Sequence, residues 1–143
     1  MAKKALNKKL VAVDLNVFLF SVIFVLDTHC WFDGSLEKLI QKNYRFPRDK
    51  YLDYLSAIQL EMAAEVKTKS AYAMSHQTGL SIITLFSYDG DAFDMGTLVH
   101  EIGHAVFRQL TDRGIDHNQE TDEVYAYCTG YLMRMLCNVL FKP

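Results

Sequence analysis

Residues 97–110 read TLVHEIGHAVFRQL, and this stretch decides the organisation of the chain. With about 100° of rotation per residue, a helix here would separate polar from apolar side chains. The polar residues share one side: Thr97, His100, Glu101, His104 and Arg108. The apolar residues share the other side: Leu98, Val99, Ile102, Ala105, Val106 and Leu110. We therefore predict a helix over about 96–112 that buries one side and turns two histidines away from the core.

The two histidines and the glutamate between them form the pattern H-E-x-x-H, here His100, Glu101 and His104. Residues i and i+4 of a helix project side by side, so both imidazoles can reach one Zn²⁺ at about 2.0–2.1 Å. The glutamate then stands over the open coordination position. We expect His100 and His104 to bind zinc, and Glu101 to act as general base toward a water that the metal has made more acidic.

A catalytic zinc site needs a third protein ligand. Suitable donors follow in the polar segment downstream: His117, Glu120, Asp122 and Glu123. Glu123 is preferred, because the 18 residues between His104 and Glu123 let the first helix end, the chain turn at Gly114 and a second helix return. His117 and Glu120 remain alternatives.

The second predicted helix covers about 120–140. Tyr127, Gly130 and Arg134 share a stripe with Glu123, whereas the apolar side carries Tyr125, Leu132 and Leu136. Tyr127 is the preferred second catalytic residue, as a donor to the oxyanion of the reaction, with Tyr131 and His117 as alternatives. Tyr127 would alternatively orient a metal ligand.

The rest of the chain supplies a small sheet and further helices. The β-branched and aromatic run 17–26 predicts a strand covered on both faces. Residues 71–77 and 80–87 predict a hairpin joined by Thr78-Gly79. Helices are expected after Ser35 up to about Asn43 and over 48–66. The order β-α-α-β-β-α-α predicts one α+β domain over residues 1–143.

HEIGH, followed by ETDEVYAY at residues 120–127, resembles the gluzincin type of metallopeptidase, in particular the minimal H-E-x-x-H proteins encoded by bacteriophages. The resemblance covers residues 71–140; earlier residues share only the strand-then-helix order. It implies a minimal zincin-like fold with a small, mostly antiparallel sheet, a bound zinc ion, peptide-bond hydrolysis and an edge strand within 80–87 that pairs with extended substrate. A metzincin is excluded, because Phe107 and Leu110 occupy its glycine and third histidine positions.

The leading function is therefore a zinc-dependent peptidase, for example a phage-encoded processing protease. Two other functions use the same residues. One is a zincin-like scaffold or binding protein with weak or no catalysis, in which the metal stabilises the fold. The other is a toxin or host-takeover factor that acts on one host protein.

Composition limits the partners and the location. A net charge of −2 provides no positive field that would gather nucleic acid. The apolar run 17–26 is too short to span a bilayer and no signal-peptidase site follows it. Three cysteines indicate no disulfide framework. We expect a cytoplasmic protein with a peptide or protein substrate, without nucleic-acid or membrane partners; the sequence leaves its oligomeric state open.

Overall fold

The computed structural model describes residues 9–43, 56, 71–76, 78–86 and 89–141. The helix expected over 48–66 lies outside these residues, apart from position 56. The described strands are β1 (Leu10–Leu15), β2 (Phe20–Val25), β3 (Ala71–His76) and β4 (Leu80–Leu85). The described helices are α1 (Ser35–Asn43), α3 (Ala92–Asp112) and α4 (Asp122–Leu140), with short 3₁₀ turns η1 (Asn16–Phe18) and η2 (Thr28–Trp31). The prediction of an α+β fold is confirmed.

The four strands form one mixed sheet in the order β1-β2-β4-β3. β2 runs parallel to β4, and the β1–β2 and β3–β4 pairs are antiparallel. β4 therefore lies inside the sheet, and all six of its residues are buried. The expectation of an edge strand within 80–87 was wrong, because the parallel pairing with β2 occupies the edge that a simple hairpin would leave open. Among the described strands, β1 and β3 form the two edges of the sheet.

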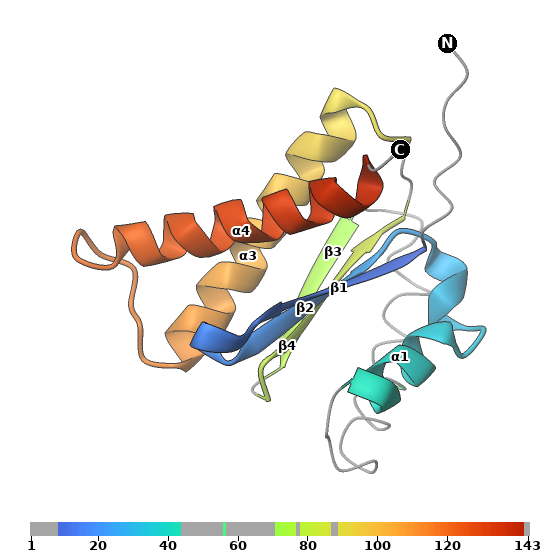
Figure 1. Ribbon diagram of the computed structural model, residues 1–143, viewed down its shortest axis with the longest axis horizontal. Coiled ribbons are helices and arrows are strands. Elements are labelled where there is room, and N and C mark those ends of the chain that lie inside the picture. The colour runs from blue at the N-terminus through green and yellow to red at the C-terminus, as the bar shows by residue number, and fades with distance from the viewer. Residues whose placement is uncertain (1–8, 44–55, 57–70, 77, 87–88, 142–143) are drawn as a thin grey trace.

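Helices cover both faces of the sheet (Figure 1). α3 contacts β3 and β4, while α4 contacts α3 and β1, so these two helices share one face. Ile102 of α3 and Leu132 of α4 meet β-strand residues such as Phe24 in the larger core. A second core on the other face joins Trp31, next to α1, to the sheet.

The N-terminal half of the sheet differs from the sequence expectation. Of the run 17–26, only Phe20–Val25 is strand, and Asn16–Phe18 form the turn η1. The preceding strand, Leu10–Leu15, was not predicted. Its burial alternates strictly from Val11 to Leu15, but Asp14 and the nearby lysines made the segment resemble a solvated terminus. An edge strand of this kind shows half the apolar signal of a central one.

The last two helices begin and end close to their predicted positions, 92–112 against about 96–112 and 122–140 against about 120–140. Val99 is the exception to the predicted apolar side, because it lies at the margin of that side and is 44% exposed. None of the helices among the described residues combines the length and apolarity needed to cross a bilayer.

Candidate metal centre

Two features of α3 determine which way the H-E-x-x-H residues face: the cap at its N-terminus and its buried apolar side. The Asp91 side chain caps the helix by accepting from the Asp94 backbone N–H at 2.9 Å. The buried Asp94 carboxylate in turn accepts from the Asp89 and Gly90 backbone N–H groups at 2.6 and 2.8 Å. The helix dipole also interacts favourably with carboxylates at the N-terminus of the helix. On the buried side, the apolar residues fully removed from solvent are Leu98, Ile102, Ala105 and Leu110.

The two histidines converge on the opposite side of α3. The Nε2 atoms of His100 and His104 lie 3.0 Å apart, a distance at which one imidazole can donate to the other. Their rings stand edge to face, with centroids 4.6 Å apart at 86°. Two nitrogen ligands of one tetrahedral zinc would lie about 3.3 Å apart. Both histidines are exposed and Glu101 between them is half-buried, so the donor pair fits a divalent metal that solvent and a substrate can reach.

The predicted third ligand does not join this pair. No group of three or more His, Cys, Asp or Glu side chains suited to a metal ion occurs within the part of the chain that the structure describes. Glu123 is exposed in the first turn of α4. His117 instead lies 2.9 Å from Asp122 and its ring packs against Tyr125. Glu120 is exposed, and its backbone N–H donates to the Asn118 side chain. The structure thus unites two of the three predicted ligands.

Tyr125 anchors the beginning of α4 to the end of α3. Its hydroxyl donates to the Ile115 carbonyl at 2.6 Å and lies 3.3 Å from the Thr111 hydroxyl. Its ring also packs against Phe107 of α3. The sequence placed Tyr125 on the apolar side of α4, which is confirmed. These contacts set where the first turn of α4, and with it Glu123, stands relative to the histidines.

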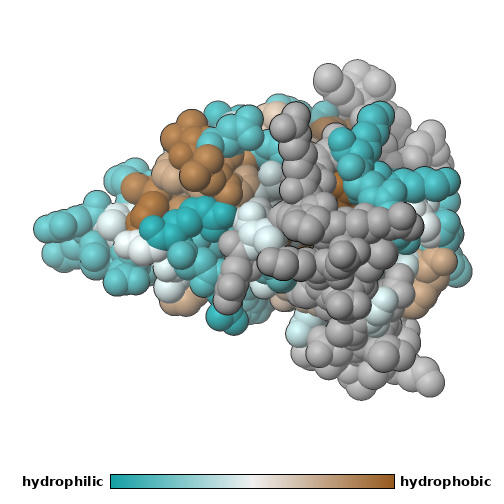
Figure 2. Space-filling model, turned by 90° about the horizontal axis from the view of Figure 1, so that it is seen from below, coloured by the Kyte–Doolittle hydropathy of each residue, from teal (hydrophilic) through white to brown (hydrophobic). Residues whose placement is uncertain are grey.

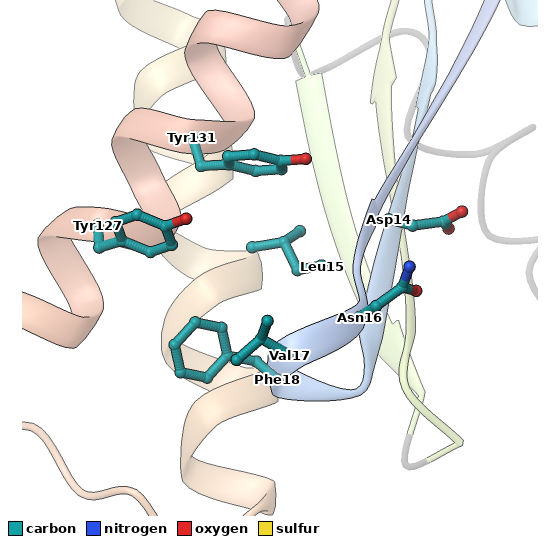
Figure 3. A pocket seen from close by; sticks show the side chains of 7 residues that line it. All are labelled: Asp14, Leu15, Asn16, Val17, Phe18, Tyr127 and Tyr131. Atoms are coloured by element: carbon teal, nitrogen blue, oxygen red, sulfur yellow. The ribbon is translucent and has the colours of Figure 1, made fainter.

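Tyr127, the predicted second catalytic residue, lies in a different pocket. Its ring centroid is 6.1 Å from that of Tyr131 and 6.3 Å from that of Phe18. These rings line a pocket of about 240 Å³ between α4 and the end of β1, shown in Figure 3. The described ring contacts of Tyr127 are therefore with η1 and with its own helix, and none is with His100 or His104. The sequence correctly placed Tyr127 on the side of α4 that faces away from the core. It did not show that this side lies next to β1.

A buried polar chain beneath α3 was missed by the sequence analysis. Gln109 is fully buried, and its amide donates to the Ser81 hydroxyl at 2.8 Å and the His76 carbonyl at 3.2 Å. Arg113 donates to the Gln109 side chain at 2.8 Å and to the Leu19 carbonyl at 2.5 Å. Burial lowers the pKa of the Arg113 guanidinium below its ordinary value. The available signal was a glutamine at a helix position that otherwise carries apolar residues.

No protein-family model, curated protein or solved structure matches this chain. Functional inference therefore depends on the residues and their geometry.

Proposed function

We propose that this protein is a metal-dependent hydrolase of peptide bonds, with zinc as the preferred ion. One observation carries the proposal: the Nε2 atoms of His100 and His104 converge to 3.0 Å on an exposed side of α3. At this distance the two imidazoles can share a hydrogen bond, and the same convergence places both nitrogens where two ligands of one ion must lie. When bound, zinc would polarise a substrate carbonyl and make a water molecule acidic enough to react near neutral pH.

The remaining chemistry belongs to Glu101. It follows His100 directly in α3 and is half-buried. In this position it would accept the proton of the attacking water and return a proton to the leaving amine. An extended substrate would pair with β3, because β3 is the open edge of the sheet that contacts α3.

Glu123 is the third ligand we propose, in accord with the resemblance to gluzincins. Its carboxylate lies in the first turn of the helix that packs against α3. Movement of that turn toward the histidines would complete the His₂Glu set that hydrolytic zinc sites use. A zincin-like fold, a cytoplasmic location and a role as a phage-type processing protease belong to the same proposal.

A scaffold function is the second candidate, and one observation favours it. The described residues contain no ready three-residue metal group. Hydrolytic zinc sites carry three protein ligands, so a site formed by two histidines alone favours binding of an ion over repeated turnover. The two candidates differ in one respect: only the hydrolase needs Glu101.

Replacing Glu101 with Gln separates them. We expect Glu101→Gln to retain zinc while cleavage of fluorescein-labelled casein, or of a quenched mixed-sequence peptide pool, falls by about a hundredfold or more. Glu120→Gln is the matched control, since it removes the same charge from an exposed loop position. We expect it to cleave at the wild-type rate.

Two results would count against the hydrolase. Equal cleavage by wild type and Glu101→Gln would remove Glu101 from the reaction. A zinc-loaded wild type that cleaves neither probe would favour the scaffold.

A further inference from the structure

The open edge of β1 offers backbone groups to an additional strand. Within the part of the chain that the structure describes, β1 is the last strand on its side of the sheet. Leu26 N–H donates to the Lys9 carbonyl at 2.8 Å, which fixes the odd-numbered residues of β1 as those bonded to β2. In an antiparallel pair the intervening residues point their N–H and C=O groups away from the neighbour. Leu10 and Ala12 therefore direct these groups toward the open edge.

An aromatic pocket lies at the same edge. Tyr127 and Tyr131 extend from α4 toward β1, with Leu15 of β1 between them and Phe18 of η1 beside them (Figure 3). The pocket measures about 240 Å³, against about 150 Å³ for an apolar cavity that accepts benzene. Asp14 also borders the pocket, but its side chain points away from the tyrosines (Figure 3) and accepts from the Ser21 hydroxyl. The space is therefore suited to an uncharged ring.

The turn beside the pocket exposes apolar side chains. Val17 is 88% and Leu19 76% exposed, and the underside of the molecule shows a compact hydrophobic patch (Figure 2). Leu19 has φ +59°, the left-handed region that a branched residue rarely adopts. Arg113 stabilises it by donating to the Leu19 carbonyl. Backbone strain of this kind clusters at functional and binding surfaces.

We propose that the open edge of β1 binds an extended segment of a partner protein, which adds a strand to the sheet and inserts an aromatic side chain between Phe18, Tyr127 and Tyr131. Side chains on alternate residues of an added strand face the same side of the sheet as Val13 and Leu15, which is the side that α4 covers. Backbone pairing supplies affinity in this mode, and the pocket selects the ring. The site shares no residue with His100, Glu101 or His104, so it stands independently of the proposed hydrolase.

The test uses the full chain and a fluorescein-labelled octapeptide of alternating threonine and phenylalanine. We expect saturable binding by fluorescence anisotropy, weakened about tenfold in Tyr127→Ala, where the pocket loses a wall. Phe93→Ala is the matched control, because Phe93 is 70% exposed and lies outside the pocket. It should bind within twofold of wild type.

Backbone pairing is tested separately. Ala12→Pro removes the outward N–H of an exposed edge position and should weaken binding about tenfold, whereas Ala12→Ser should not. If Ala12→Pro does not fold, a peptide N-methylated at alternate residues tests the same bonds on the wild-type protein, and it should bind about tenfold more weakly.

Three results would overturn the proposal. One is the absence of binding at millimolar peptide. Another is binding that neither Tyr127→Ala nor peptide N-methylation changes. The third is a dimer in sedimentation velocity that Tyr127→Ala dissociates, since a second copy of this chain would then occupy the edge.

Discussion

At the scale of single residues, polar side chains in the described core each have a partner. Ser81 accepts from Gln109, and the Thr84 hydroxyl accepts from the Trp31 indole at 2.9 Å. Asp94 accepts from two backbone N–H groups at the start of α3. A buried polar group without such a partner costs about 1–3 kcal/mol. The sequence shows that Gln109 interrupts an apolar side, but its partners lie 28 and 33 residues away and only the fold reveals them.

Cys128 gives a prediction at this scale. The residue is fully buried on α4, and burial raises the pKa of its thiol from 9.0 to about 11. The folded protein therefore holds this proton more tightly than the unfolded chain, so the stabilisation is complete below pH 9.0 and is lost as the pH rises toward about 11. We expect wild type to lose about 2 kcal/mol of unfolding free energy across this window relative to Cys128→Ala.

Urea unfolding of both proteins at several pH values measures this difference. Comparison with Cys128→Ala cancels the titration of tyrosines and lysines that both proteins share. If the two stability curves run parallel across the window, the buried thiol is not the cause.

At the scale of elements, the sequence predicted what local spacing determines and missed what pairing determines. α3 follows from the spacing of apolar residues such as Leu98 and Ile102, and α4 from that of Leu132 and Leu136. The hairpin follows from Thr78-Gly79, and Gly79 indeed has φ +98°. The position of β4 inside the sheet depends on its parallel pairing with β2, about 60 residues earlier in the chain. No local pattern records that pairing.

Gly79 gives the prediction at this scale. A Cβ at Gly79 would lie 2.6 Å from the Leu19 carbonyl oxygen and 2.5 Å from Nη2 of Arg113. Gly34 also has a positive φ, +85°, but nothing lies within 4 Å of its Cβ position. We expect Gly34→Ala to cost about 1 kcal/mol from conformation alone, and Gly79→Ala to cost about 3 kcal/mol or more, because the turn must also separate from η1.

Thermal and urea unfolding of the two alanine variants measure the comparison. Equal losses of stability in Gly79→Ala and Gly34→Ala would mean that the contact between the hairpin and Leu19 does not support the fold.

At the scale of the whole molecule, the geometry of the candidate site depends partly on one helix and partly on how separate elements pack together. His100 and His104 are one turn apart, so the helix alone brings their Nε2 atoms to 3.0 Å, as the sequence predicted. The position of Glu123, the proposed third ligand, depends on the connection between α3 and α4. The contacts of Tyr125 and His117 fix that connection. Tyr127 illustrates the same limit: its outward face was predictable, but its neighbour β1 was not.

We therefore expect a bound zinc ion to connect α3 to α4. Binding of an ion by the histidines and Glu123 would join the two helices and stabilise the folded chain by mass action. Glu120 lies in the same connection and carries the same charge, and it serves as the control for Glu123.

Zinc titration of the full chain, measured by isothermal titration calorimetry, tests most directly whether His100 and His104 hold a metal. We expect one zinc per chain in wild type, Glu101→Gln and Glu120→Gln, about tenfold weaker binding in Glu123→Gln and at least about a hundredfold loss in His100→Ala and His104→Ala. Zinc binding that survives replacement of both histidines, or that is absent from the wild-type protein, would contradict the claim that these two side chains converge in order to hold a metal.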